Sequence, residues 1–304
     1  MLAAAAALAI VVQDHTSVRS APSATATELT ALWPGDVVEV RAEHAGYLRI
    51  YNYERERGGY VRNDSIRAID LSEAGAPELL AILRFLRDSP GNESLGISYG
   101  AAYLRAVPAR ALSAEPFDAI ASMAERLADA ASGKGSHLLA AHLEVVGQFG
   151  VRMRSFERNG QVQVCYDGDL FRRVLALPGA SPEARAHAVL ALTRADCIDP
   201  AASPPVRAAL DAERAHLLEG IDDRALSPLT RARLHARRAT VWAALAFTRA
   251  RRAEPASGAA QRALAELAVV HPEELGTDRR GEYLDALVRV GAVRWAAEIG
   301  RAHV

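Results

Sequence analysis

Residues 32–40 read Leu32-Trp33-Pro34-Gly35-Asp36-Val37-Val38-Glu39-Val40. The middle of this stretch, Pro34-Gly35-Asp36, predicts a turn, because proline has a fixed φ and glycine adopts a left-handed conformation at little cost. From Val37 to Ala42, valine and alanine side chains alternate with polar ones over most of the run. A period of two predicts a β-strand, here entered through a tight turn.

Similar segments lie on both sides of this turn. One precedes it and two follow it: Val18-Arg19-Ser20-Ala21-Pro22-Ser23, Gly46-Tyr47-Leu48-Arg49-Ile50 and Gly58-Gly59-Tyr60-Val61. In the second of them, Leu48 and Ile50 alternate with Tyr47, Arg49 and Tyr51. Several short strands at this spacing predict a small barrel or sandwich over residues 10–70.

Together, the four segments resemble a bacterial SH3-like (SH3b) domain. In that family a first strand ends in hydrophobic-Arg-Ser-x-Pro, and a Gly-Asp turn opens a strand of alternating hydrophobic side chains. A Gly-aromatic-x-x-hydrophobic strand follows, and Gly-Tyr-Val closes the barrel. The resemblance covers about a fifth of the chain. It implies a β-barrel that serves as a binding module, common in cell-envelope proteins, and leaves the ligand open.

Aromatic side chains are dense in this region: Trp33, Tyr47, Tyr51, Tyr53 and Tyr60. They either fill the interior of a small barrel or line an exposed groove for a peptide or glycan, since tyrosine and tryptophan combine a large contact area with a polar tip. We therefore take these five residues as the candidate ligand-binding set.

Composition limits the class of protein. The chain has 304 residues, half of them hydrophobic, and a net charge of −1. This length suits roughly two domains, and the near-neutral charge argues against nucleic acid as a partner. No apolar run reaches the roughly eighteen residues of a membrane span.

The N-terminus suggests export. Residues 1–9 are apolar and alanine-rich and end in Ala7-Leu8-Ala9, which resembles the end of a secretory signal without its basic n-region. Alternatively, these residues lead into a first strand at Ile10–Val12. Export predicts a periplasmic or secreted protein, and the alternative location is cytoplasmic.

The two cysteines, Cys165 and Cys197, are expected to form a disulfide if the compartment is oxidising. Cys165 lies on a predicted strand and Cys197 at the end of the helix region that follows it. A strand, a short helix, a turn and an antiparallel helix bring these two ends back toward each other. If the chain stays in a reducing compartment, two buried thiols are the alternative.

The helical spacing of apolar side chains over residues 77–297 predicts an irregular all-helical array, without a fixed-period repeat. Helices are expected from Pro77 to the Ser89-Pro90 break and over residues 94–107, 116–131, 136–149, 169–177, 182–196, 204–219, 228–252, 258–270 and 278–297. One β-hairpin is inserted at residues 151–166, because two alternating runs flank Asn159-Gly160. The fold class expected is therefore α+β multidomain, an SH3-like barrel followed by this array.

Catalytic and metal-binding patterns are weak. His137, His142 and Glu144 stand at i, i+5 and i+7, which does not put both histidines on one helix face. Asp167 and Asp169 fit a turn and a helix cap, and Cys165 with His187 makes a poor nucleophile–base pair. We expect no cofactor. Arginines near residues 231–238 and 249–252 are interpreted as a solvated strip, with an RNA or anionic-lipid surface as the minor alternative.

The last seven residues, Glu298-Ile299-Gly300-Arg301-Ala302-His303-Val304, are encoded by GAGATCGGAAGAGCACACGTC, which resembles a sequencing-library adapter. We expect residues 298–304 to carry no function and the natural sequence to differ after Ala297.

Two classes of function remain. The first is a non-catalytic binding or scaffold protein of the cell envelope, whose barrel contacts peptidoglycan peptide, glycan or a protein. The second is an enzyme with an unrecognised site in a groove of the helical part. The first class needs no catalytic motif, so it is the expected one. The sequence predicts no oligomeric state.

Overall fold

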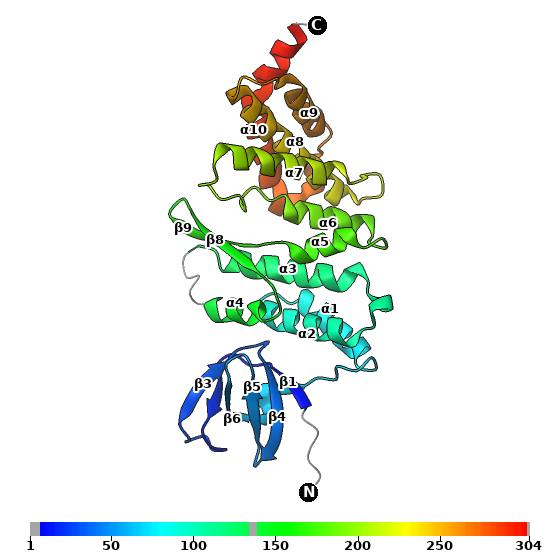
Figure 1. The fold of residues 1–304 in the computed structure, drawn as a ribbon. Coiled ribbons are helices and arrows are strands. Elements are labelled where there is room, and N and C mark those ends of the chain that lie inside the picture. The colour runs from blue at the N-terminus through cyan, green and yellow to red at the C-terminus, as the bar shows by residue number, and fades with distance from the viewer. Residues whose placement is uncertain (1–6, 134–138, 303–304) are drawn as a thin grey trace. The chain divides into compact units, whose positions relative to one another are not determined.

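The structure is a computed structural model that describes residues 7–133 and 139–302, apart from the side chains of residue 278 and residues 299–302. The fold is mixed: a seven-stranded antiparallel sheet comes first, and helices and one small hairpin follow (Figure 1). The chain forms two compact units, the first ending at Arg173 and the second beginning at Val174.

The sheet holds strands β1 to β7 in the order β3-β2-β6-β5-β4-β1-β7, which leaves β3 and β7 at its edges. The strands are β1 (Ala7–Val11), β2 (Thr16–Arg19), β3 (Glu28–Leu32), β4 (Val37–His44), β5 (Tyr47–Asn52), β6 (Arg57–Arg62) and β7 (Ile66–Ala68). Strand β4 begins at Val37, directly after the Pro34-Gly35-Asp36 turn, as the sequence predicts, and Gly35 has a φ of 102°. The β-rich N-terminal region is thus confirmed as an antiparallel sheet.

One face of the sheet supplies the core of the β region. Its buried side chains are Ala9, Val11, Val18, Leu32, Val38, Ile50, Val61 and Ile66. Burying each larger one contributes about 1.5–3 kcal/mol relative to exposure. Ile10 points the other way, against a cluster that includes Leu79 and Tyr99 of the helices that follow. The sheet is therefore packed on both faces near β1.

Strand β1 starts earlier than the predicted Ile10–Val12. Ala7, Leu8 and Ala9 pair with Val40, Glu39 and Val38 of β4, and Ala9 is buried. Cleavage after Ala9 would remove these pairings from the sheet. This observation favours the interpretation of residues 7–9 as part of the strand, and the export of the chain stays a prediction.

The first unit continues with helices and the hairpin (Figure 1). These elements are α1 (Ala76–Arg87), α2 (Glu93–Ala106), α3 (Ala114–Ala130), α4 (Ala140–Gly147), β8 (Met153–Arg158), β9 (Gln161–Tyr166) and the first part of α5 (Asp169–Ala176), which continues into the second unit. Leu83, Ile97, Ile120 and Met123 form the centre of their apolar core. Helix α4 is shorter than the predicted 136–149, since it ends at Gly147, and residues 136–138 lie outside the described part of the chain.

The predicted hairpin is confirmed. Asn159 and Gly160 have φ values of 54° and 74°, the left-handed pair that a type I′ turn needs. Ser132, at the end of α3, bonds strand β9 through its hydroxyl, which accepts from the Val164 amide at 2.9 Å. Val164 also packs on Ala128 and Ala131. These contacts fix the hairpin to α3. An isolated two-stranded hairpin is only marginally stable in water, so this packing supports it.

The second unit is helical, with α6 (Pro182–Leu192), α7 (Pro204–Glu219), α8 (Pro228–Arg251), α9 (Ser257–Ala268) and α10 (Gly276–Ala302). Three of these helices begin at the predicted Ser-Pro steps. Ser181 and Ser227 accept hydrogen bonds from the amides of Ala184 and Thr230, as helix caps do. No described helix combines the length and the apolarity that crossing a membrane requires.

The prediction of a solvated arginine strip on α8 is wrong for two of its members. Arg238 is buried and donates to the carbonyls of Leu218 and Ile221. Arg237 donates to the Leu190 carbonyl at 3.0 Å, and burial lowers its pKa to about 10. The last carbonyls of a helix lack partners within that helix. These guanidinium groups therefore satisfy the carboxyl ends of α6 and α7.

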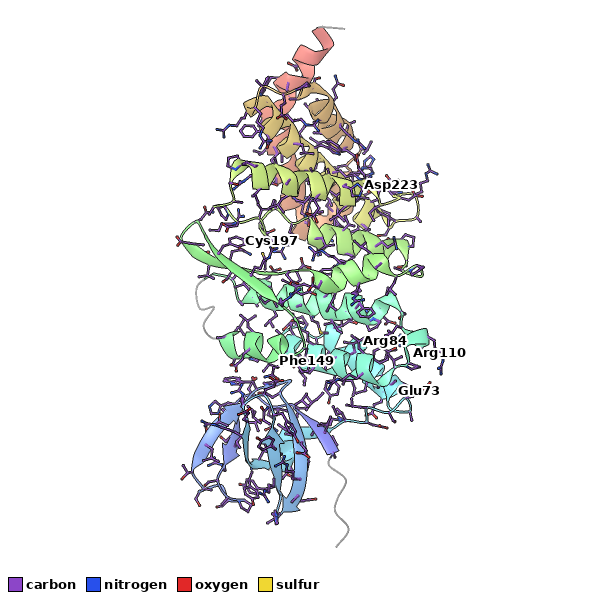
Figure 2. The ribbon with its side chains drawn as sticks, viewed as in Figure 1. Glu73, Arg84, Arg110, Phe149, Cys197 and Asp223 are labelled. Carbon is purple, nitrogen blue, oxygen red and sulfur yellow. The ribbon has the colours of Figure 1, made fainter. Side chains whose placement is uncertain are left out.

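The predicted disulfide is present: Cys165 of β9 and Cys197, in the segment after α6, are bonded to each other (Cys197 is labelled in Figure 2). Figure 2 also labels Arg84, which binds Glu115 through two hydrogen bonds of 2.6 and 2.7 Å, and Arg110, which pairs with Glu73. The two ion pairs lie on the surface of the first unit, where such pairs contribute little to stability.

Candidate ligand-binding face

The outward face of strands β4, β5 and β6 gathers three of the five predicted aromatic residues. Directly opposed residues in an antiparallel pair share a face. Tyr47 lies opposite Arg62, Arg49 opposite Tyr60, and Tyr51 opposite Gly58. Tyr47, Tyr51 and Tyr60 are half-buried, whereas Leu48 and Ile50 between them belong to the core. We call this surface, with Tyr53 beside it, the tyrosine face.

The Tyr51 end of the tyrosine face is tightly organised. The Tyr51 and Tyr53 rings meet edge to face with centroids 5.0 Å apart, and the Arg41 guanidinium stacks 4.3 Å from the Tyr51 centroid. Glu39 accepts hydrogen bonds from Arg41 at 2.7 Å and from the Tyr53 hydroxyl at 3.0 Å. These bonds, that from Arg41 above all, lower the pKa of Glu39. Arg41 is thereby neutralised locally by Glu39.

The other end of the face carries Tyr60, whose ring lies 6.0 Å from that of His44. Arg62 forms a two-bond pair with Asp64. Arg19 of β2, which lies opposite Tyr60, donates to the Ala26 carbonyl at 2.7 Å. Arg62 and Arg19 therefore already use some of their donors in hydrogen bonds to neighbouring groups of the chain.

Arg49 stands at the centre of the tyrosine face. It lies between Tyr47 and Tyr51 along β5 and opposite Tyr60 on β6, and its side chain is exposed. Among the residues that the structure describes, it has neither an ion-pair nor a hydrogen-bond partner for its side chain. The face thus surrounds an available guanidinium group with three aromatic rings.

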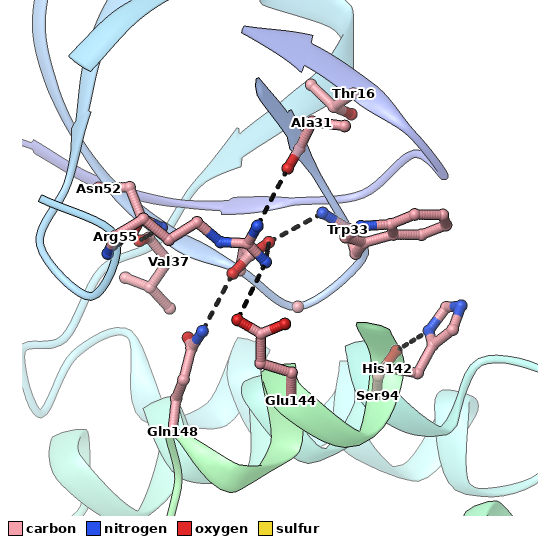
Figure 3. Close-up of polar contacts among 12 residues, drawn as sticks. Thr16, Ala31, Trp33, Val37, Asn52, Arg55, Ser94, His142, Glu144 and Gln148 are labelled. Atoms are coloured by element: carbon pink, nitrogen blue, oxygen red, sulfur yellow. Dashed lines mark hydrogen bonds and ion pairs between the residues drawn. The ribbon is translucent and has the colours of Figure 1, made fainter. Parts of the chain in front are cut away.

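Trp33 lies apart from the tyrosine face. Its ring meets that of His15, with centroids 5.8 Å apart, and that of His142 on helix α4, with centroids 5.6 Å apart. Trp33 and His142 are labelled in Figure 3. Half-buried, Trp33 packs where the sheet meets the helices. The five predicted residues are therefore not brought together: four lie at the outer sheet face, and Trp33 lies at the contact of sheet and helix.

A polar cluster occupies this contact, which we call the sheet–helix junction: Asp36, Arg55, Glu144 and Gln148 (Figure 3). Asp36 accepts from the Trp33 amide at 2.8 Å and from Gln148 Nε2 at 3.3 Å. Arg55 Nη2 lies 3.7 Å from Asp36 Oδ2 and 3.8 Å from Glu144 Oε1. Both distances are too long for direct hydrogen bonds.

Burial dominates the electrostatics of the junction. The Asp36 side chain is fully buried, and this desolvation raises the pKa of its carboxyl group. The Trp33 amide, the charge of Arg55 and the Gln148 amide act in the opposite direction, and Glu144 adds a further rise. Within the described residues, Arg55 Nε and Nη2 are buried without a hydrogen-bond partner. The junction is thus a structural contact with one incompletely bonded cation.

Ser94, His142 and Asp14 form a serine–histidine–aspartate arrangement. Ser94 Oγ lies 2.9 Å from His142 Nδ1, and His142 Nε2 lies 4.0 Å from Asp14 Oδ1. A nucleophilic serine must reach its substrate, but Ser94 is 3% exposed and sits in the first turn of α2. The hydrogen bond therefore serves to tie α2 to α4.

The other candidates from the sequence have structural surroundings. Asp167 accepts from the Asp169 amide, as expected of a turn at the start of α5, and Arg152 pairs with both carboxylates. Cys165 is held in the disulfide. His137 lies outside the described residues. Within the described ranges there is no group of three or more side chains suited to hold a metal ion.

Comparisons of the chain with protein-family models, with curated proteins and with solved structures give no match in any of the three. The assignment of a function therefore depends on the geometry of the chain itself.

Sequence reasoning named the tyrosines of the face but passed over Arg49 as a site residue. The signal was available, since Arg49 stands at the middle of the alternation Tyr47, Arg49, Tyr51 and must share their face. The junction gave no such signal, because Asp36 and Gln148 are 112 positions apart.

Proposed function

We propose that the chain is a non-catalytic binding or scaffold protein of the cell envelope. In this proposal the N-terminal sheet is an SH3-like module that contacts a cell-wall peptide or glycan, or a protein partner, through the tyrosine face. The helical part presents this module or docks it to other components. The location is periplasmic or secreted.

The observation that carries the proposal is the grouping of the half-buried Tyr47, Tyr51 and Tyr60 around the exposed Arg49. Tyrosine and arginine are enriched where proteins bind partners, because they combine contact area with directional hydrogen bonds. The Cys165–Cys197 disulfide is compatible with an oxidising compartment. The motifs of residues 18–61 that resemble SH3b domains support the same class of function.

An enzyme with a site in the helical part is the alternative. Ser94 and His142 are hydrogen-bonded residues of types that occur in catalytic sites. Because Ser94 is buried, its hydroxyl is poorly placed to act as a nucleophile. The binding proposal needs only a surface, and the chain offers one.

The proposal is tested by co-sedimentation of the full chain with purified peptidoglycan sacculi. We expect saturable binding, and we expect Tyr51→Ala and Tyr60→Ala each to weaken it by about 1–2 kcal/mol, or roughly 5–30-fold. The matched control is Phe85→Ala, since Phe85 of α1 is an aromatic residue of the first unit that is 71% exposed. It should bind as wild type does.

Thermal unfolding of the same variants separates binding from folding. If Tyr51→Ala and Tyr60→Ala lower the stability of the protein and leave its affinity unchanged, the tyrosines are structural. If the wild-type chain does not sediment with sacculi, a cell-wall ligand is excluded.

A further inference from the structure

The arginines of the tyrosine face differ in how many N–H groups of their guanidinium groups donate hydrogen bonds within the chain. Arg41 is bonded to Glu39, Arg62 to Asp64, and Arg19 to the Ala26 carbonyl. Arg49 is exposed and has no side-chain partner among the described residues. The face therefore offers one complete guanidinium fork.

The surroundings of Arg49 fix where this fork stands. Tyr47 and Tyr51 precede and follow it at alternate positions of β5, and Tyr60 lies directly across on β6. Diagonal and direct cross-strand neighbours are within reach of aromatic side chains. Opposite Tyr51 stands Gly58, which has no side chain to cover the space beside the ring. A ligand group at Arg49 would therefore touch aromatic rings as well.

The charge and the free donors of Arg49 indicate the chemistry of the ligand. A guanidinium group matches a carboxylate through two parallel hydrogen bonds, and such charge-assisted pairs are stronger than neutral ones. Arg41 and Arg62 are paired to carboxylates of the chain and Arg19 donates to a carbonyl group, whereas Arg49 has all of its donors available among the described residues. A carboxylate occupies two parallel donors of the Arg49 guanidinium group and neutralises its charge.

We propose that Arg49 binds a free carboxylate of a cell-wall peptide, and that Tyr47, Tyr51 and Tyr60 contact the apolar part of the same peptide. This inference rests on the proposed function and adds the chemical class of the ligand. Arg49 acts as the anchor of the site and the tyrosines form its walls.

The test uses the full chain and two preparations of the same peptidoglycan sacculi. One is native, and in the other the free carboxylates are converted to methylamides with carbodiimide and methylamine. Amidation removes the charge and keeps the glycan and the peptide backbone. We expect wild-type affinity for amidated sacculi to fall by about tenfold.

Variants of Arg49 complete the design. Arg49→Gln should lose about tenfold on native sacculi and nothing further on amidated ones, because the contact is already absent. Arg49→Lys keeps the charge without the two-bond geometry and should recover part of the loss. The control is Arg105→Gln, which removes the same charge from an exposed position of α2 and should leave binding unchanged.

Each outcome decides between the two proposals. Binding of wild type to native and amidated sacculi with equal affinity overturns the carboxylate site and leaves the proposed function standing. The same holds if a folded Arg49→Gln protein, checked by circular dichroism, binds as wild type does. Failure of the wild type to bind either preparation excludes a cell-wall ligand from the proposed function and overturns this inference with it.

Discussion

Asp36 shows how one residue can serve two purposes in this fold. In the turn before β4 its carboxylate accepts a hydrogen bond from the amide of Trp33, three positions earlier. The same side chain is fully buried at the sheet–helix junction and meets Gln148 of the segment after α4. The turn bond favours the ionised carboxylate, and burial disfavours it.

The raised pKa of Asp36 makes the free energy of unfolding depend on pH. The groups that face it are the Trp33 amide, Arg55, Gln148 and Glu144. Because the folded protein holds the Asp36 proton more tightly than the unfolded chain does, stability falls as pH rises from about 4 through the folded-state pKa. Below both pKa values this contribution is absent, and above both it is a constant cost.

Denaturant unfolding at a series of pH values, with wild type and Asp36→Asn, measures this effect. Asparagine keeps an acceptor for the Trp33 amide and cannot ionise. The stability of wild type minus that of Asp36→Asn should decrease as pH rises from about 4 through the folded-state pKa of Asp36. A difference that stays flat or increases over this range would show that burial does not control the Asp36 carboxyl group.

At the scale of elements, the turn between β3 and β4 docks directly on helix α2. Ser98 of α2 donates to the Gly35 carbonyl at 2.7 Å. A Cβ atom on Gly35 would lie 2.5 Å from Ser98 Oγ and 2.8 Å from the Ser94 carbonyl. Glycine is therefore required at this position for its conformation and for the close approach of the helix.

Two glycine substitutions separate these requirements. Gly35 and Gly46 both have positive φ, but a Cβ on Gly46 would meet no atom within 4 Å. We expect Gly46→Ala to cost about 1–2 kcal/mol of stability, from backbone conformation alone. Gly35→Ala should cost about 3 kcal/mol or more, because overpacking adds to the same strain. Equal losses by chemical denaturation would mean that the turn is not held closely against α2.

Local chemistry predicted several elements correctly, and the reasons are visible in single residues. Asn159-Gly160 specified the hairpin because few other pairs accept two positive φ values. Ser181-Pro182 and Ser227-Pro228 specified helix starts, because serine caps and proline lacks the amide hydrogen that would be unsatisfied. Information of this kind lies within a few positions of the chain.

Contacts between distant segments could not be predicted in the same way. Arg238 was expected in solvent, yet it bonds the carbonyl of Leu218, twenty positions away. The alternation of β5 identifies the tyrosines of the face, but Trp33 was grouped with them only through its proximity in sequence. Packing determines these outcomes, and a single sequence does not display it.

At the scale of the whole molecule, the Cys165–Cys197 disulfide closes a loop that contains α5 and α6. A crosslink of this length restricts the unfolded chain. Where this loss of chain entropy is the dominant effect, the bond stabilises the folded state by roughly 3–4 kcal/mol. The same bond links the stability of the protein to the redox state of its compartment.

Removal of the disulfide should therefore lower the free energy of unfolding by about 3 kcal/mol. The measurement is urea unfolding of the oxidised protein, the reduced protein and the Cys165→Ala/Cys197→Ala variant, of which the last two should agree. Thiol titration of the natively purified protein, denatured without reductant, provides the control and should detect no free thiol. Two reactive thiols would contradict both the bond and the oxidising compartment.

Hydrogen–deuterium exchange on the full chain, with and without solubilised peptidoglycan fragments, locates the bound ligand most directly. The proposed function places the ligand on the tyrosine face, so amides of β5 and β6, residues 47–62, should exchange more slowly when it is bound. Peptides from α6 to α10 should exchange at unchanged rates. Slower exchange confined to the helices, with residues 47–62 unaffected, would contradict the assignment of the tyrosine face as the binding surface.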